Sequence, residues 1–360
     1  MVRWRSGMVS RVVRRWRGAI ELEVGTPDGT VRALAYPGLV GSPQPGDRVL
    51  LNVGALVMGL GTGGYALVVA LPDRLPPDPV ANGTTRGSGH LVKARYTPLQ
   101  PILLGVDEEA SPHRDVMTAA SSLDGMPVVT ADLHSALPAI LAGVHADRPT
   151  ARVAYVMTDG GALPAWFSRT LDALRDHLAG TITTGQAFGG DLEASTVHTG
   201  LLAARHVLGA DVTIVAQGPG NLGTGTPWGF SGVALGEAVN AIAVLNGHPI
   251  GSLRISDGDA RARHHGVSHH SLTAYGKVAL APADLVLPDG LSPDIEAALK
   301  PLLARHTLIR VATDGLDAAL RASPVALSTM GRGLDADYAY FLAAAAAGRH
   351  AASLIGGPRL

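Results

Sequence analysis

The most concentrated group of ionisable side chains lies between residues 257 and 270. Four of the fourteen histidines fall within seven residues, His264–His270, and aspartate and arginine side chains precede them. Imidazole and carboxylate groups suit Zn, Mn or Fe, so one interpretation is a divalent metal site built from Asp257, Asp259 and His264. The spacing matches no standard zinc motif, and two other interpretations compete with this one.

In the second interpretation the same segment binds an anion. Arg261 and Arg263 would hold a phosphate or carboxylate group, because guanidinium groups form strong charge-assisted hydrogen bonds with both. His269 or His270 would then serve as a general acid–base, since an unperturbed imidazole titrates near pH 6.5. The third interpretation is a polar loop whose histidines are structural or surface groups.

A glycine-rich loop follows the apolar run 212–217. Backbone N–H groups in such loops converge on anions, and threonine hydroxyls add donors. The candidate anion-binding residues are Gly218, Gly220, Asn221, Gly223, Thr224, Gly225 and Thr226. The segment formally matches G-x-G-x-x-G, but Pro227 and Trp228 delay the helix, which disfavours a dinucleotide site. A purely structural loop is the competing interpretation.

Acidic residues follow several predicted strands. Asp132, Asp159 and Asp314 each occupy such a position, and Asp159 precedes Gly160-Gly161, which makes it a candidate catalytic acid. Each acid could instead cap a helix. Ligands in open α/β sheets bind beyond the carboxyl ends of the strands. We therefore expect these acids, the glycine-rich loop and segment 257–271 to meet at one edge of a sheet.

The elements that would position these residues alternate between strand and helix from about residue 91. The predicted strands are Ile102–Val106, Pro127–Thr130, Val153–Thr158, Val212–Gln217, Gly251–Ile255 and Leu308–Ala312. The predicted helices are Ala136–Val144, Ala165–Leu178, Gly232–Leu245, Leu272–Leu280, Pro293–Ala304 and Ala336–Ala347; a further one, after a loop over 183–191, would carry Glu193 and His198. This alternation predicts an α/β fold with a mostly parallel, doubly wound (Rossmann-like) sheet.

The first part of the chain has a different pattern. Apolar residues alternate around the Asp28-Gly29 turn signal, which predicts a hairpin, and further short strands follow near 49–51 and 65–70. We predict a small β-barrel-like domain, SH3-like or OB-like, over residues 1–72. A Pro- and Gly-rich linker over 73–90 would join it to the α/β domain over 91–360.

Basic residues crowd the N-terminus. Six arginines and two tryptophans lie within the first 17 residues, which on a small barrel raises the alternative of nucleic-acid binding through phosphate contacts and base stacking. No RNA- or DNA-binding signature accompanies them. A solvated strand edge explains the same pattern.

The composition limits the classes of function. A net charge of −1, with 46% hydrophobic and 16% charged residues, excludes an acidic tail protein, a basic nucleic-acid coat and a disordered chain. The absence of cysteine excludes disulfides, thiolate–zinc sites and thiol nucleophiles, and suits a reducing compartment. No apolar stretch is long enough for a membrane span or a secretory signal, so we expect a cytoplasmic protein without a membrane partner.

Several long strings resemble a known bacterial family. These are QGPGNLGTGTPWGFSG (217–232), RISDGDARARHHGVSHHSLTA (254–274) and MTDGGALPAWFSRTL (157–171), together with GTGGY (61–65) and HLVKARYTPLQ (90–100). The resemblance is to the family catalogued as domain of unknown function 3866. It covers nearly the whole chain and implies no reaction, cofactor or catalytic residue.

The function expected from the residues is therefore binding or transformation of a small anionic molecule, phosphorylated or nucleotide-like. Its cleft would lie at the carboxyl edge of the sheet, with Asp159, His269 and His270 as catalytic candidates. The alternatives are a nucleic-acid-associated or regulatory adaptor that uses the basic barrel, and a scaffold without chemistry. Whether the chain is an enzyme, binds a divalent metal or forms a homo-oligomer stays open at this point.

Overall fold

The computed structural model describes residues 2–61, 63–78 and 89–356. These residues form two compact units, one of residues up to 104 with 166–172, the other of 105–165 with 173–360. Most of the expected linker, residues 79–88, lies outside the described residues, and the domain boundaries given above stay a prediction. No helix in the described ranges is both long and apolar enough to cross a membrane.

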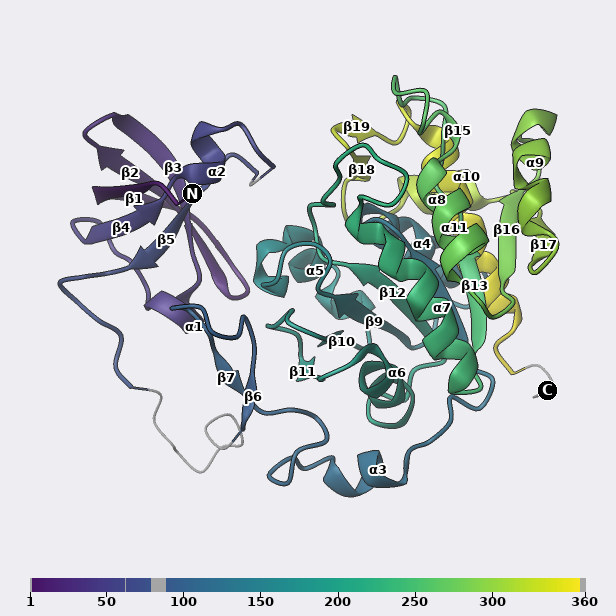
Figure 1. Cartoon of the computed structure of the whole chain (residues 1–360), viewed down its shortest axis with the longest axis horizontal. Coiled ribbons are helices and arrows are strands. Elements are labelled where there is room, and N and C mark those ends of the chain that lie inside the picture. The colour runs from purple at the N-terminus through teal and green to yellow at the C-terminus, as the bar shows by residue number, and fades with distance from the viewer. Residues whose placement is uncertain (1, 62, 79–88, 357–360) are drawn as a thin grey trace. The chain divides into compact units, whose positions relative to one another are not determined.

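The first unit contains a closed barrel of five strands in the order β1-β2-β3-β5-β4 (Figure 1). The strands are β1 (Trp4–Trp16), β2 (Ala19–Thr26), β3 (Gly29–Ala35), β4 (Arg48–Asn52) and β5 (Ala66–Ala70). The hairpin predicted around the Asp-Gly turn joins β2 to β3, and Val24, Leu22 and Leu51 lie in the barrel core. The small N-terminal barrel is thus confirmed.

The basic N-terminus is the longest strand of this barrel. Arg5 and Arg11 on β1 form ion pairs with Asp28 and Glu23, so part of the basic surface is neutralised locally. Segment 166–172 also belongs to this unit, where Trp16 donates its indole N–H to the carbonyl of Trp166 at 2.7 Å. Short helices α1 (Pro37–Val40) and α2 (Gly54–Val57) and the strand pair β6 (Leu91–Val92) and β7 (Ile102–Leu103) complete the unit.

The second unit is built on an eight-stranded sheet in the order β11-β10-β9-β12-β8-β13-β16-β17, with every neighbouring pair parallel. Its strands are β8 (Pro127–Ala131), β9 (Val153–Thr158), β10 (Gly180–Thr183), β11 (Leu192–Glu193), β12 (Val212–Gln217), β13 (His248–Ser252), β16 (Asp284–Pro288) and β17 (Thr307–Val311). The predicted Rossmann-like α/β architecture is confirmed.

Helices cover the sheet on both faces (Figure 1). The helices of the second unit are α3 (Arg114–Ala119), α4 (Leu137–Asp147), α6 (Val197–His206), α7 (Ala234–Val244), α8 (His269–Thr273), α9 (Pro293–Leu299), α10 (Leu316–Arg321) and α11 (Tyr338–Ser353), whereas residues 169–172 of α5 (Arg169–Ala173) belong to the first unit. On one face α4 packs closely against α11. A Cβ on Gly143 of α4 would lie 1.9 Å from the carbonyl oxygen of Ala345, and one on Gly348 would lie 2.0 Å from that of Ile140. The close packing of these two helices therefore requires glycine at both positions.

Several element predictions differ from the structure. Residues 102–106 contribute only the short strand β7, which pairs with β6 outside the parallel sheet. The helix expected over 165–178 is broken into a 3-10 turn, the five-residue α5 and another 3-10 turn, because its start packs on the barrel unit. The helix expected over 272–280 starts earlier, as α8, and continues as a π-helical turn over Ala274–Val278. Glu193 lies on β11 and not on a helix.

Candidate functional site: a pocket at the carboxyl edge of the sheet

The carboxyl ends of neighbouring parallel strands bring the predicted segments together. Asp132 follows β8, the glycine-rich loop 218–230 follows β12, and Arg254 follows β13. The order β12-β8-β13 makes these strands neighbours, so the segments that leave them emerge side by side. Ligands in doubly wound sheets bind beyond this carboxyl edge.

Hydrogen bonds fix the base of the glycine-rich loop. The side-chain amide of Gln217, at the end of β12, donates to the carbonyl oxygen of Asp132 at 2.7 Å and to Asn221 Oδ1 at 2.9 Å. Ser231 Oγ donates toward Gln217 Oε1 at 2.6 Å or Asn221 Oδ1 at 2.8 Å. The two ends of the loop are therefore tied to each other and to the segment after β8.

The tip of the loop is a narrow turn that exposes backbone donors. Thr224 N–H donates to the carbonyl of Gly229 at 2.7 Å, and Gly229 N–H donates to Thr226 Oγ1 at 3.1 Å. Within the described residues, the N–H groups of Gly223, Gly225 and Thr226 have no hydrogen-bond acceptor. All three residues are exposed and line a pocket, so their N–H groups are available to solvent or to a ligand there.

The opposite wall of the pocket comes from the segment between β14 (Ile255–Ser256) and β15 (Gly266–Val267), and a network of ion pairs holds it. Asp259 is buried and receives a bidentate pair from Arg261, at 2.8 and 2.6 Å. Arg254 and Arg332 approach the same carboxylate at 3.5 and 3.3 Å. The hydrogen bonds from Arg261 hold the pKa of Asp259 far below its usual range, so this carboxylate stays ionised.

Three histidines of this segment form one cluster. His264 is buried and its Nδ1 lies 2.8 Å from Ser268 Oγ, while Ser268 caps α8 by accepting from the N–H of His270. His270 Nδ1 lies 3.1 Å from Asp132 Oδ2, and the His270 ring stacks on Phe230 with centroids 3.8 Å apart. The His269 ring lies 4.5 Å from that of His270.

The surroundings favour neutral imidazoles in two of these histidines. Burial, together with the charges of Arg254 and His270, lowers the pKa of His264 to about 3. Burial and the charge of His270 also lower the pKa of His269. The pKa of Asp132 is lowered, although the residue is buried. Its burial alone would raise its pKa, but the hydrogen bond from His270 and the charge of Arg254 lower it. An ionised carboxylate thus lies behind the histidine cluster.

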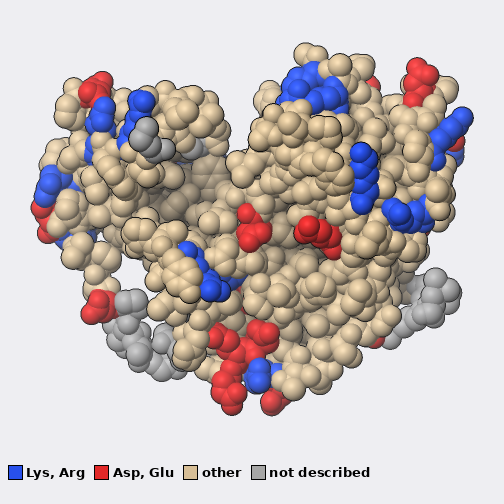
Figure 2. Space-filling model, viewed as in Figure 1, with Lys and Arg blue, Asp and Glu red and all other residues tan. Residues whose placement is uncertain are grey.

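The resulting pocket has a volume of about 130 Å³. Its lining residues are Asn221, Gly223, Gly225, Thr226, Gly229, Phe230, Arg254, Arg261, Arg263, His264, His269, His270 and Met330. Arg254, Arg261, Arg263 and Arg332 supply four positive charges around it against three carboxylates, from Asp132, Asp259 and Asp337. The surroundings therefore carry a net charge of +1 while the imidazoles are neutral. Figure 2 shows basic side chains gathered over this end of the second unit, near β15 in Figure 1.

Comparison with known families gives one match. The family model described as Protein of unknown function (DUF3866) matches residues 32–348, most of the chain. The chain belongs to this family. No curated protein matches it. The family assignment thus confirms the resemblance seen in the sequence strings and adds no activity, which leaves the geometry of the site as the basis for any functional argument.

Most of the predicted ligand-binding residues share this pocket. Asn221, Gly223, Gly225, Thr226, Arg261 and Arg263 line it, as do the predicted catalytic candidates His269 and His270. Gly218, Gly220 and Thr224 do not line it. A Cβ on Gly218 would lie 2.4 Å from the carbonyl oxygen of Ala162, so this glycine serves close backbone packing. Thr224 braces the loop tip through its bond to Gly229.

Asp159 does not reach the pocket. Its side chain is exposed and accepts a hydrogen bond from the N–H of Gln186 at 2.8 Å, so it ties the turn after β9 to the turn after β10. Asp314 is exposed in the turn after β17 and is also absent from the lining. Asp159 therefore joins two turns, and of the three acids only Asp132 lies beside the histidines.

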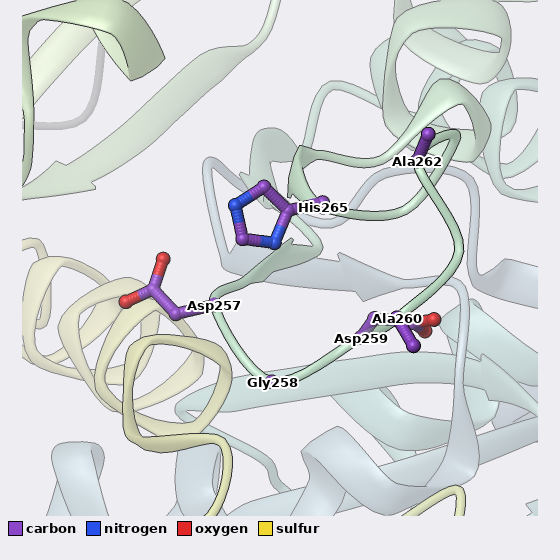
Figure 3. A pocket seen from close by; sticks show the side chains of 6 residues that line it. All are labelled: Asp257, Gly258, Asp259, Ala260, Ala262 and His265. Atoms are coloured by element: carbon purple, nitrogen blue, oxygen red, sulfur yellow. The ribbon is translucent and has the colours of Figure 1, made fainter.

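The predicted metal trio is not assembled. Asp257 and His265 line a separate, open hollow of about 510 Å³, and they extend to one side of the loop while the carboxylate of Asp259 points to the other side (Figure 3). The oxygens of Asp259 are occupied by arginines. In the described residues His264 is instead grouped with His269 and His270, with ligand atoms all within 4.8 Å of one another.

Some residues of the site were not predicted from the sequence. Arg254 has a signal, because it directly follows the strand that ends at the pocket, yet it is buried and braces both Asp132 and Asp259. Phe230 and Met330 also line the pocket. Arg332 joins the network from 73 positions beyond Asp259. No local pattern indicates such a long-range contact.

A second histidine cluster lies at the opposite edge of the sheet. His248 and His350 both place Nε2 on Asp284 Oδ2, at 2.8 and 2.7 Å. His248 and Asp284 begin β13 and β16, whereas His350 comes from α11. Because both Nε2 atoms already contact the carboxylate, these hydrogen bonds link α11 to the sheet.

Proposed function

We propose that the protein binds a small anionic molecule, phosphorylated or carboxylate-bearing, in the pocket between the glycine-rich loop and the His264–His270 segment. The observation that carries this proposal is the convergence of unsatisfied loop donors and unpaired positive charge. Gly223, Gly225 and Thr226 offer free N–H groups, and the exposed Arg263 has no ion-pair or hydrogen-bond partner for its guanidinium among the described residues.

The size of the pocket narrows the ligand class. The pocket measures about 130 Å³. Pockets that enclose a whole drug-sized ligand measure about 300–1,000 Å³. We therefore infer that the pocket encloses an anionic head group, a phosphoryl or a carboxylate, while the remainder of a nucleotide-like ligand would lie outside it.

The roles of the arginines differ. Arg254 and Arg261 are already neutralised by Asp132 and Asp259, so they hold the wall of the pocket and contribute donors. Arg263 is the cation left over, and a ligand anion would be its partner. A transformation of the ligand would fall to His269 and His270, the two predicted acid–base candidates that line the pocket.

The adaptor alternative draws less support from the barrel unit. Its arginines Arg5, Arg11 and Arg32 pair with carboxylates, which removes part of the charge that phosphate backbones would meet. Binding to nucleic acid through the remaining basic residues predicts an affinity that falls steeply with salt. Filter binding across a salt series separates this alternative from a pocket ligand.

Isothermal titration with inorganic phosphate, pyrophosphate and a nucleoside monophosphate tests the proposal, with chelator present. Arg263→Ala is expected to weaken phosphate binding about tenfold or more, because a hydrogen bond to a charged group contributes about 1.5–3 kcal/mol. Arg148→Ala is the matched control, since this exposed arginine follows α4 at the opposite edge of the sheet. Equal affinity of both variants, or no heat with any of the anions, would overturn the proposal.

A further inference from the structure

The three imidazoles that line the anion pocket are close enough to share one ion. The ligand atoms of His264, His269 and His270 all lie within 4.8 Å of one another. Around a tetrahedral Zn²⁺ with Zn–N bonds of about 2.0–2.1 Å, neighbouring nitrogens are about 3.3 Å apart. Closing the cluster onto an ion therefore requires each ring to move by about 1 Å or less.

The hydrogen bonds of the cluster leave the Nε2 atoms free. Nδ1 of His270 lies 3.1 Å from Asp132 Oδ2, which can only accept, and 3.3 Å from Arg254 Nη1, which can only donate, so both neighbours contact Nδ1 and neither contacts Nε2. A carboxylate behind a histidine is the arrangement that orients metal-binding imidazoles. His264 likewise uses Nδ1 toward Ser268. Among the described residues the ring nitrogens of His269 have no hydrogen-bond partner.

The rings are also held in place before any ion arrives. His270 stacks on Phe230 with an interplanar angle of 3°, and both side chains are buried. His264 is 2% exposed and is fixed through Ser268, the N-cap of α8. A cluster with preset ring orientations loses less conformational entropy on binding an ion.

We propose that His264, His269 and His270 bind one divalent transition-metal ion, such as Zn²⁺ or Co²⁺, through one ring nitrogen each. Three protein ligands leave one coordination position of a tetrahedral ion, the arrangement of metal sites that bind a further ligand and not of closed structural sites. All three histidines line the pocket with Arg263, so that position faces the anion. The proposal deepens the anion-binding function and rests on it only for the identity of the fourth ligand.

The test is a titration of tag-free, chelator-treated protein with Co²⁺, followed by visible absorption and equilibrium dialysis. The expected result is one Co²⁺ per chain with the intense visible bands of a tetrahedral site. His269→Gln is the primary variant, because its ring makes no hydrogen bond whose loss would disturb folding. We expect at least about a tenfold loss of affinity and a changed spectrum. His264→Gln and His270→Gln should behave alike, with circular dichroism confirming that each variant is folded.

Two controls come from the same chain. His265 is the sequence neighbour of His264 but lines the separate hollow with Asp257 (Figure 3) and not the pocket, so His265→Gln should leave Co²⁺ binding unchanged. The double variant His248→Gln/His350→Gln removes the second histidine cluster and should also leave it unchanged. Absence of stoichiometric binding, or equal binding by wild type and His269→Gln, would refute the metal site. So would loss of binding in the double variant alone.

Phosphate titration with and without metal separates the two proposals. Phosphate binding in chelator, with no Co²⁺ binding, refutes the metal site and leaves the anion pocket standing. Co²⁺ binding with unaltered affinity when Arg263 is replaced, and no phosphate binding in either state, refutes the anion pocket and leaves the metal site.

Discussion

Acidification should destabilise the α/β unit through His134, and the size of the effect follows from its position. His134 opens the 3-10 turn η2 (His134–Ala136) two residues after Asp132, and its Nδ1 lies 2.9 Å from the hydroxyl of the buried Tyr155. Burial lowers the pKa of His134 to about 4, despite a hydrogen bond to the backbone of Gln217 that works in the other direction. The imidazole is therefore neutral in the folded protein at pH 5–7.

The sign and magnitude follow from linkage. The unfolded chain takes up this proton near pH 6.5, whereas the folded chain takes it up only near pH 4. Between these values the unfolded state binds more protons, so the free energy of unfolding falls as the pH falls, by about 1.4 kcal/mol per pH unit. The free energy of unfolding is not reduced by this proton above pH 6.5. It is lower by about 3 kcal/mol once the pH reaches 4.

Urea unfolding of wild type and His134→Asn between pH 7 and pH 4 measures this contribution. Helical circular dichroism is the appropriate signal, because α4, α6, α7 and α11 all belong to the α/β unit. The asparagine amide replaces Nδ1 and does not titrate, so the variant should be less stable at pH 7 but should have a shallower pH dependence. The two free energies should converge by about 3 kcal/mol between pH 6.5 and pH 4. Parallel curves would show that His134 does not remain neutral in the fold.

Three further outcomes are expected. Gly348→Ala should lower the free energy of unfolding by about 1–3 kcal/mol, because its Cβ would lie 2.0 Å from the carbonyl oxygen of Ile140; an unchanged thermal midpoint would contradict this. Gly229→Ala should weaken phosphate binding about tenfold by displacing both threonine hydroxyls of the loop tip, while Gly223→Ala, with nothing closer than 3.9 Å, should bind normally in the same calorimetric assay. Burial alone would raise the pKa of Asp284, but hydrogen bonds from two histidines lower it well below its usual range, so its stabilising contribution is present above about pH 4 and is lost as the pH falls further. Acid unfolding of Asp284→Asn should lack this component.

The elements that could be predicted from the sequence are those with continuous apolar runs. Residues 153–158 and 212–217 form β9 and β12 with the predicted bounds, because a strand buried on both faces needs apolar side chains throughout. β10 and β16 were not predicted. β10 begins with Gly180 and alternates threonine with isoleucine, and β16 starts at Asp284 and ends in proline. Their strand character comes from neighbouring strands and not from their own composition.

The residues of the site also fall into those that local sequence predicts and those that it does not. The general placement of ligands at the carboxyl ends of strands correctly brings loop 218–230 and His264–His270 into one pocket. Local sequence does not indicate which carboxylates are consumed by ion pairs. The sequence makes Asp259 a candidate metal ligand. In the structure its carboxylate instead forms ion pairs with Arg261 and with Arg332, which is distant in sequence. Roles that depend on long-range partners require the tertiary structure.

The two histidine clusters together explain why the chemistry is expected at only one edge of the sheet. Both groups place three ligand atoms near one another. In the second cluster, however, the Nε2 atoms of His248 and His350 form hydrogen bonds with Asp284. In the pocket Asp132 and Arg254 contact Nδ1 of His270 instead, and no described residue forms a hydrogen bond with its Nε2; His270 lines the pocket together with Gly223, Gly225 and Arg263. The same residue types thus close one site into a structural joint and leave the other available to a ligand. The nitrogen that faces the carboxylate decides between them.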